Sequence, residues 1–294
     1  MQKLEYKDLL EAGVHFGHLR KKWNPKMQPY IFMERKGIHI IDLNRTLEAL
    51  DETANALKQI AKSGKKILFV ATKKQAKEIV AEAANKVNMP YVTERWLGGM
   101  LTNFATIRKS IKKMQSIEKM ITDGTAENIT KKERLQLSRE KAKLEKVLGG
   151  IANMSRIPAA IYMVDINHEN IALAEAQRLN IQTFGMVDTN SDPTKVDFAV
   201  PANDDATKSI AIITNYLTEA IIEGLNERKK DKDDAEGEED ETNNNVEFAD
   251  VADEDDSRRS RDKKTDGRSG KPGQRRRTTS GSSNRPRTGG GPKK

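Results

Sequence analysis

The chain has 294 residues, of which 36% are hydrophobic and 33% are charged, and its formal net charge at pH 7 is +8. It contains no cysteine, which excludes disulfide scaffolds, thiolate zinc sites and cysteine nucleophiles. Its apolar runs, such as residues 67–71, are far shorter than the roughly 20 residues that span a bilayer, and its N-terminus has no apolar signal region. These features predict a soluble cytoplasmic protein that does not associate with a membrane. The basic net charge makes a polyanion the expected partner.

Charge is unevenly distributed along the chain. Residues 231–256 hold fourteen carboxylates and one lysine, and residues 257–294 hold fourteen Lys or Arg and two Asp. This acidic-then-basic segment has only six apolar side chains, too few to offset its chain entropy, so a disordered tail is predicted over 231–294. Two interpretations of the tail stay open: a soluble, self-compensating extension, or an unfolded arm that touches RNA through Arg275, Arg276 and Arg277. The remaining residues, 1–230, form the predicted core domain.

In the first half of the core, short strands alternate with helices. Residues 34–37 suit a hairpin turn, and an irregular segment rich in His, Trp, Gly and Pro precedes the hairpin. Asn44 is predicted to cap a long helix that Gly64 ends. The expected elements are a helix at 6–13, strands at 30–33 and 38–42, a helix at 44–64, a strand at 67–71, a helix at 73–88 and a strand at 90–92.

The second half of the core repeats the alternation. Its expected elements are strands at 159–164, 182–187 and 198–200 and helices at 169–179 and 206–226. Strands that are apolar throughout and separated by helices indicate a parallel sheet covered on both faces, joined by right-handed crossovers. The predicted fold class is α/β, with a doubly wound parallel sheet.

An insertion at 103–148 interrupts the alternation. Phe104, Ile107, Ile111, Met114, Ile117 and Ile121 form a narrow apolar stripe on a helix, residues 123–125 break it, and Thr130 caps a second helix with a weaker stripe that Lys141 interrupts. Two narrow stripes joined by a short turn predict an antiparallel coiled-coil hairpin. The insertion has twelve Lys or Arg and six Asp or Glu. On charge alone, a solvated surface and an arm that follows RNA phosphates explain this equally well.

Three loops carry basic residues, and two of them also contain aromatic rings. Residues 15–27 mix rings, cations and amides, which suits phosphate contact and base stacking. Thr72-Lys73-Lys74 lies where a core strand enters its helix, a position that presents backbone N–H groups and ammonium charges to an anion, although the glycines of a P-loop are missing. Residues 94–103 form a loop with a Gly pair, in which Trp96 is expected to close the core.

Seven segments in this order closely resemble the bacterial small-subunit ribosomal protein S2 (uS2) family: 15–27, 38–43, 69–75, 94–103, 148–151, 184–188 and 201–205. The resemblance covers roughly residues 3–226, a domain-scale span. It implies a Rossmann-like α/β domain with a protruding coiled-coil hairpin and no catalytic activity. It also implies contact with small-subunit ribosomal RNA and with neighbouring ribosomal proteins, including the large mRNA-binding protein S1. The tail after Lys230 is longer than is typical of the family.

RNA contacts are expected from the N-terminal loop, the strand-end loops and the basic hairpin. The predicted RNA-binding residues are His15, Arg20, Lys21, Lys22, Trp23, Asn24, Lys26, Lys73, Lys74, Arg95, Asn103, Arg108, Lys109, Lys112, Lys113, Arg139 and Lys143. No cofactor is required for such a role.

A metal site is predicted at His18, Asp188, Asp204 and Asp205. Asp188 follows the strand at 182–187, and the Asp pair follows the strand at 198–200, so parallel neighbours bring three carboxylates to one sheet edge. Three like charges there need a cation, a helix N-terminus or protonation, and His18 supplies a nitrogen acceptable to zinc. In the resembling family, these positions match residues associated with a bound metal. The alternative is that Asp204 or Asp205 caps the closing helix while His18 faces RNA.

The runner-up function is an α/β enzyme that binds a nucleotide or sugar phosphate at the carboxyl edge of its sheet. The sequence has no Gly-x-Gly-x-x-Gly, no nucleophile elbow and no helical His-Glu-x-x-His. Only Asp165 and Asp188, both at strand ends, could form the pair of catalytic carboxylates that an enzyme of this kind needs.

Overall fold

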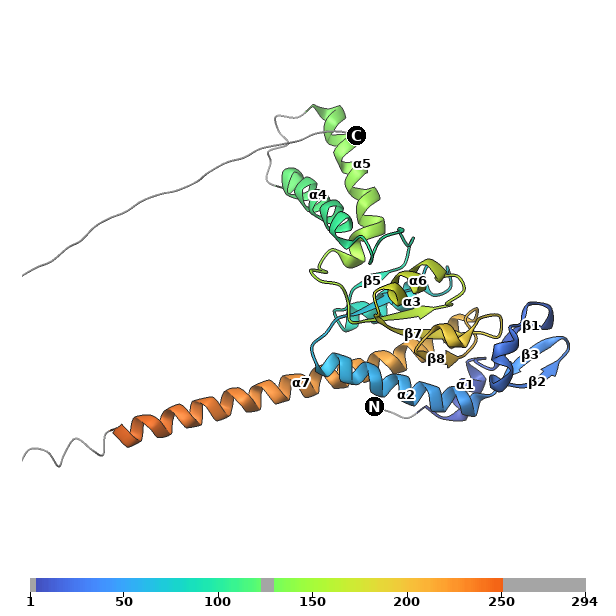
Figure 1. Cartoon of the computed structure of the whole chain (residues 1–294). Helices are drawn as coiled ribbons and strands as arrows, with labels where there is room; N and C mark the ends of the chain where they lie inside the picture. The colour runs from blue at the N-terminus through green and yellow to red at the C-terminus, as the bar shows by residue number, and fades with distance from the viewer. Residues whose placement is uncertain (1–3, 123–129, 251–294) are drawn as a thin grey trace, which may run out of the picture. The chain divides into compact units, whose positions relative to one another are not determined.

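The computed structural model describes residues 4–122 and 130–250, with side chains described as far as Asp231 (Figure 1). The chain divides into two compact units, Met1–Glu239 and Asp240–Lys294, and the two sheets lie in the first unit. Within the described residues, no helix combines the length and apolar character that crossing a membrane requires.

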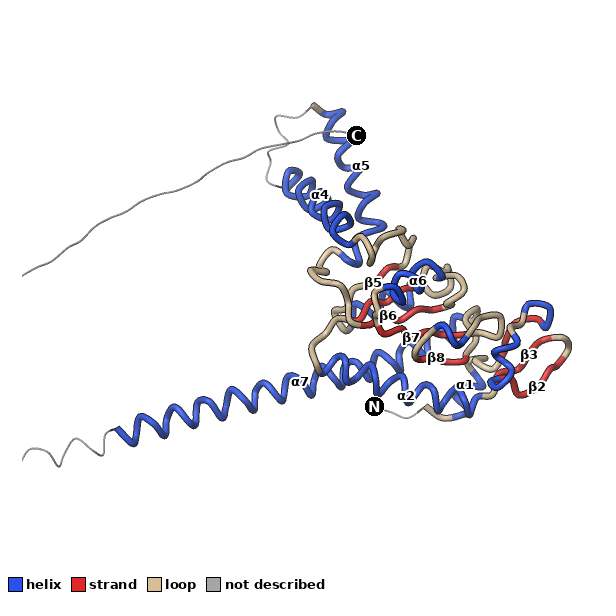
Figure 2. The backbone as a smooth tube through the Cα atoms, in the orientation of Figure 1, coloured by secondary structure: helices blue, strands red, loops and turns tan. Residues whose placement is uncertain are grey.

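A five-stranded parallel sheet, in the order β5-β4-β6-β7-β8, forms the centre of the first unit (Figure 2). From β4 the chain moves outward to β5, and it then returns to β6 on the other side of β4, so the strand order reverses between β4 and β6. The predicted parallel sheet is confirmed. Its strands are β4 (Ile67–Val70), β5 (Tyr91–Val92), β6 (Ala160–Val164), β7 (Gln182–Val187) and β8 (Phe198–Pro201).

Alternate residues of the strands enter two apolar clusters, one on each face of the sheet. Phe69 and Tyr162 belong to one cluster, and Leu68 and Ile161 belong to the other. The first face is covered by α1 (Tyr6–Glu11), α2 (Leu43–Lys62), α3 (Lys77–Lys86) and α7 (Thr207–Asp250). The second is covered by α6 (Asn170–Arg178) and the base of the inserted hairpin. Helices therefore lie on both faces, as a doubly wound fold requires.

A smaller antiparallel sheet, in the order β1-β3-β2, precedes the main sheet. The predicted hairpin is confirmed: β2 (Ile31–Arg35) and β3 (Ile38–Ile41) are joined through Lys36 and Gly37, whose φ angles of 53° and 76° suit a tight hairpin turn. The prediction that the preceding segment is irregular is wrong at β1 (Phe16–Leu19), which pairs with β3 across a shifted register. Two short 3-10 helices, Arg20–Lys22 and Pro25–Tyr30, complete the segment.

Several helix ends differ from the predictions, and three of the differences affect the site or the boundary of the core domain. Helix α2 begins at Leu43, because the side chain of Asp42 accepts a hydrogen bond from the Asn44 N–H and so caps the helix in place of Asn44. Helix α3 begins at Lys77, which leaves Lys73 in the turn that follows β4. Helix α7 continues to Asp250, beyond the boundary predicted at residue 230. The rest of the predicted tail, 251–294, lies outside the described residues.

The insertion consists of two helices, α4 (Phe104–Thr122) and α5 (Lys131–Leu148), which pack against each other. Four residues of the predicted stripe, Ile107, Ile111, Met114 and Ile117, are buried. The Thr130 hydroxyl accepts from the Glu133 N–H at 3.4 Å, as predicted for the cap. Lys141, which interrupts the stripe of α5, forms an ion pair with Glu118 of α4 at 2.9 Å. The turn predicted at 123–125 lies outside the described residues.

Candidate functional site

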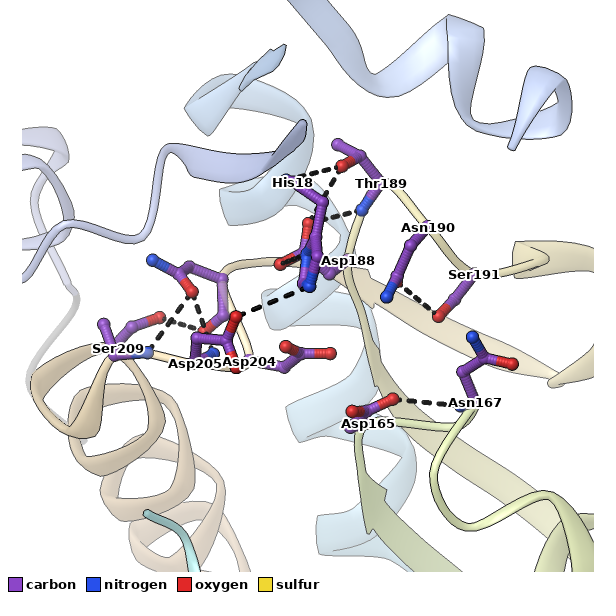
Figure 3. Close-up of polar contacts among 12 residues, drawn as sticks. His18, Asp165, Asn167, Asp188, Thr189, Asn190, Ser191, Asp204, Asp205 and Ser209 are labelled. Carbon is purple, nitrogen blue, oxygen red and sulfur yellow. Dashed lines mark hydrogen bonds and ion pairs between the residues drawn. The ribbon is translucent and has the colours of Figure 1, made fainter. Parts of the chain in front are cut away.

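The four predicted metal-site residues meet at the carboxyl edge of the parallel sheet (Figure 3). His18 Nδ1 lies 2.9 Å from Oδ2 of Asp188, and His18 Nε2 lies 3.4 Å from Oδ2 of Asp205. One ligand atom each of His18, Asp188 and Asp204 lie within 4.8 Å of one another. Asp188 and Asp204 are almost completely buried, while Asp205 is half exposed.

His18 reaches this edge because β1 lies against the end of β7. The Thr189 hydroxyl accepts a hydrogen bond from the His18 N–H at 2.8 Å, and the Thr189 carbonyl accepts one from the Asn24 N–H at 2.7 Å. Gly17 permits the close approach, since a Cβ there would lie 2.6 Å from a Thr189 methyl group. Asp188 in turn accepts hydrogen bonds from the N–H and hydroxyl groups of Thr189.

Lys73 also belongs to the cluster. The sequence predicts instead that Lys73, at the end of a core strand, contacts an external anion. Its Nζ lies 2.7 Å from Asp204, 2.6 Å from Asp205 and 3.3 Å from Asp165. Asp165 also follows a strand, β6, and its other oxygen accepts from the N–H groups of Asn167 and His168. Lys73 and Asp165 thus belong to the same edge, at the point where the strand order reverses.

Burial and neighbouring charges shift the pKa values of three members of the cluster. Burial, and then the charges of Asp165 and Asp188, raise the pKa of Asp204 to about 7. The hydrogen bond to Asp188 raises the pKa of His18 above its ordinary value. Burial opposes the charge of Lys73, but its hydrogen bonds to Asp204 and Asp205 outweigh this and raise its pKa. Oδ2 of Asp204 is buried and has no hydrogen-bond partner among the described residues. An acceptor in this position suits a cation.

The alternative role for the Asp pair, a cap on the closing helix, is not what the structure has. Oδ1 of Asn203 accepts from the N–H groups of Asp205 and Ala206, and the Asn203 carbonyl accepts from the hydroxyl of Ser209. Asn203 therefore makes the turn that leads into α7. The side chains of Asp204 and Asp205 remain available to Lys73 and His18.

Most of the predicted RNA-binding residues are exposed. Ten cations lie on the surface without an ion-pair partner among the described residues or, for Arg20, with an exposed partner, Glu34, at 3.3 Å. They are Arg20, Lys21, Lys22, Lys74, Arg95, Arg108, Lys109, Lys112, Arg139 and Lys143. Their positions are compatible with RNA contact, which stays a prediction.

Other predicted RNA-binding residues have partners within the protein. Lys26 donates to Asp192 at 2.7 Å and lowers the pKa of that carboxyl to about 2. Lys113 forms an ion pair with Glu140 across the two hairpin helices. The Asn24 side chain caps a 3-10 helix, and the Asn103 side chain accepts from the Thr106 hydroxyl at 2.9 Å.

The aromatic rings of the N-terminal loop contact other rings of the protein, although Phe16 is also exposed. Trp23 packs on His39, with their ring centres 5.0 Å apart. The centres of the His15 and Phe16 rings lie 4.0 Å apart, and burial lowers the pKa of His15.

Glu175 has an organising role that no sequence pattern predicted. Its two oxygens accept from the indole N–H of Trp96 and from the backbone N–H groups of Gly99, Leu101 and Thr102, at 2.7 to 3.1 Å. Trp96 is buried, as predicted. One carboxylate of α6 therefore holds the loop that leads into the hairpin. A glutamate inside an otherwise apolar helical stripe was the available signal.

Comparisons with known proteins agree on one family. The family described as ribosomal protein S2 matches residues 9–224. The chain is 65% identical over 240 residues to the small ribosomal subunit protein uS2 of Cytophaga hutchinsonii, covering 82% of this chain and 94% of that protein. It is 63% identical to the proteins of the same name from Bacteroides thetaiotaomicron and Flavobacterium johnsoniae, covering 80% and 79% of this chain and 85% and 91% of those proteins. The chain belongs to the ribosomal protein S2 (uS2) family.

Proposed function

We infer that this protein is a structural component of the small ribosomal subunit, and that it works in the cytoplasm, where the ribosome is. The observation that carries this inference is the similarity at 60% identity or more to several proteins named small ribosomal subunit protein uS2, over most of both chains. The protein is not an enzyme. Asp165 and Asp188, which kept a carboxylate pair open, are instead engaged with Lys73 and His18.

Ribosomal RNA of the small subunit is the proposed main partner. The exposed cations of the N-terminal loop and of helices α4 and α5 support this role, because unpaired cations can replace the counterions of RNA phosphates. Trp23, Asn24 and Lys26 fit a role in shaping the N-terminal loop that presents Lys21 and Lys22.

Neighbouring ribosomal proteins, including S1, are the second class of proposed partner. The small antiparallel sheet exposes four large apolar side chains: Phe16, Leu19, Phe32 and Met33. Exposed apolar groups that lie together on one sheet are typical of protein contact surfaces. This sheet also carries His18, so a protein bound there would lie close to the carboxylate cluster.

A structural zinc ion is proposed at His18, Asp188, Asp204 and Asp205. One imidazole and carboxylates form an acceptable zinc set, and the buried, unpartnered Asp204 oxygen offers a ligand atom without breaking a hydrogen bond. A bound zinc ion would neutralise the carboxylates and fix β1 against the end of β7. Elemental analysis of the purified protein, compared with Asp188→Ala, tests this: zinc content independent of Asp188 contradicts the site.

Sedimentation of a cell lysate tests the main inference. A component of the small subunit follows that subunit through washing at moderate salt, whereas a protein of another function stays in the supernatant. Absence from washed small subunits would refute the proposed function.

A further inference from the structure

Two hollows border each other at the base of the hairpin, where Ser155, Arg156 and Ile157 line both. The first, of about 840 Å³, lies at the amino-terminal edge of the parallel sheet, between the turns that precede β4 and β5 and the segment that follows α5. The second, of about 860 Å³, lies against the first turns of α4. We refer to these two adjoining hollows together as the groove; the first lies at the edge of the sheet opposite the carboxylate cluster.

The charge of this groove has one sign. Lys65, Lys66 and Arg156 line the first hollow, and Arg108, Lys109 and Lys112 join Arg156 in the second. No Asp or Glu lines either hollow in the described part of the chain. None of the six cations has an ion-pair partner among residues 4–122 and 130–231, although the Lys66 Nζ donates to the Asn88 carbonyl at 2.7 Å. A groove of this kind suits a chain of phosphates.

The first hollow also offers the apolar surface and the hydrogen-bonding groups that a nucleobase requires. Tyr91 and the half-exposed Ile157 supply flat or apolar surface, and the side-chain amides of Asn85, Asn88 and Asn153 supply donors and acceptors. Its wall is shaped by a close approach, since a Cβ at Gly150 would lie 2.2 Å from the Tyr91 carbonyl oxygen. The hollow is therefore built by the packing of the hairpin base against β5.

We propose that this groove binds a single-stranded segment of RNA, with an unpaired base in the hollow beside Tyr91 and Ile157 and with the phosphates following Arg156 onto the base of α4. The proposal rests on the proposed function, in which RNA of the small ribosomal subunit is the main partner. An acidic protein segment would satisfy the cations but would leave the amides and the apolar surface of the first hollow unused. Unpaired RNA uses both, because its bases are free to leave the stack.

Fluorescence anisotropy with the full chain and a labelled oligouridylate of about eight nucleotides, within the range that one small single-strand-binding module covers, tests the groove. Reversing Lys66 and Arg156 to Glu should weaken binding at least tenfold, and the loss of two phosphate contacts should reduce the salt slope by about 1.4. Ile157→Ala should weaken binding a few-fold with an unchanged slope, because it removes apolar surface and no charge. The matched control reverses Lys7 and Lys208, which are exposed and unpaired among the described residues on α1 and α7.

Three results would overturn the proposal. One is an equal loss of affinity in the control variant, which would indicate general charge attraction. The second is equal affinity for a duplex of the same length, which would leave the base hollow without a role. The third is displacement of the oligouridylate by an oligoglutamate at lower concentration, which would indicate a protein partner.

Ultraviolet cross-linking of washed small subunits provides an independent test. Tyr91 should carry an RNA adduct, whereas the exposed Tyr6 on α1 should not. A protein that sediments with the small subunit but shows no adduct at Tyr91 and no effect of the groove variants refutes the groove alone. A protein that is absent from the subunit refutes the proposed function instead.

Discussion

The Nζ atom of Lys73 lies 2.7 Å from Oδ1 of Asp204, inside a cluster of carboxylates at the carboxyl edge of the sheet. Asp204 is fully buried and Lys73 is largely so, which means that each group depends on the other for its charge. The same carboxylates form the proposed zinc site. Lys73 contacts Oδ1 of Asp204 and of Asp205, whereas Oδ2 of Asp204 has no partner among the described residues and remains available to zinc. Lys73 and a zinc ion would therefore neutralise the same carboxylates through different oxygens, and each should weaken the binding of the other.

The first prediction concerns Lys73→Met. Removing one partner of a buried pair strands the other, so the metal-free variant should lose about 3–5 kcal/mol of unfolding free energy. Zinc should recover part of this loss, because it neutralises the carboxylates that have lost their ammonium group and meets no cation beside them. At a hundredfold excess over its Kd, zinc stabilises a folded protein by about 2.7 kcal/mol. Melting temperatures with and without zinc measure both effects.

Lys74→Met is the control for this experiment, since Lys74 is exposed and has no ion-pair partner among the described residues. Its zinc response should match that of the unmodified chain. If zinc raises the melting temperature of Lys73→Met no more than that of Lys74→Met, the two cations do not share a site.

The second prediction concerns Glu175→Gln. The amide places an NH₂ group against N–H donors where the carboxylate accepted four backbone or indole hydrogen bonds. The expected cost is about 2–3 kcal/mol of unfolding free energy, since hydrogen bonds to a charged acceptor are lost and buried donors are left unpaired. Chemical denaturation measures it. The far-UV spectrum should remain unchanged, because the loop and not a helix is released.

This cost should depend on pH. Burial alone would raise the pKa of Glu175, but the hydrogen bonds from Thr102, Leu101, Gly99 and Trp96 outweigh it, so the folded pKa lies below the ordinary value of 4.5. A carboxyl with a lowered folded pKa stabilises the fold above its unfolded pKa and loses that contribution as pH falls through the folded pKa. The difference between the variant and the unmodified chain should therefore be full at pH 7 and shrink below about 4.5. A difference that stays constant into acid would contradict this.

The sequence predicts the parallel sheet well because each of its strands is apolar on both faces. The strand at 182–187 has the predicted bounds, and the strand at 159–164 differs by one residue. Strand β1 escapes prediction, because Phe16 and Leu19 are exposed and no alternation of apolar and polar residues marks it. It pairs with β3, and its contact with the end of β7 is made through Thr189, which lies 171 positions away from His18 in the chain.

The candidate site was predictable as far as the carboxyl-edge rule was applied. The rule correctly brought Asp188, Asp204 and Asp205 together from the ends of two strands. It applies equally to Lys73 and Asp165, which follow β4 and β6, but Lys73 was interpreted as a phosphate ligand. A sum of the charges at that edge would have paired it with the carboxylates. The approach of His18 depends on the contact between Gly17 and Thr189, which no local pattern reveals.

The third prediction concerns two cations of the hairpin that do not line the groove at its base. Arg139 and Lys143 of α5 are exposed and have no ion-pair partner among the described residues. Reversing both to Glu should reduce incorporation into small subunits and flatten its salt dependence, because fewer counterions are released. The helices should persist, since neither side chain belongs to the buried stripe. Lys113 is left unchanged because reversing it would also break its ion pair with Glu140.

Quantitative sedimentation across a salt series measures this effect. The variant that reverses Lys7 and Lys208 provides a control of equal charge. Incorporation of the α5 variant that equals that of the unmodified chain at every salt concentration would show that this side of the hairpin serves solvent or protein neighbours.

The last prediction concerns Gly17→Ala. The new Cβ would lie 2.6 Å from the Thr189 methyl carbon and 3.0 Å from the His39 carbonyl oxygen, so β1 must move away from the end of β7. Overpacking of this kind costs about 1–3 kcal/mol, and the movement carries His18 away from Asp188. We therefore expect a lower melting temperature together with a weaker zinc response. Gly98→Ala is the control, because a Cβ at Gly98 meets no heavy atom within 4 Å, and it should leave both quantities unchanged. A Gly17→Ala variant that is destabilised but binds zinc as the unmodified chain does would show that His18 is not held to the metal site by the contact between Gly17 and Thr189.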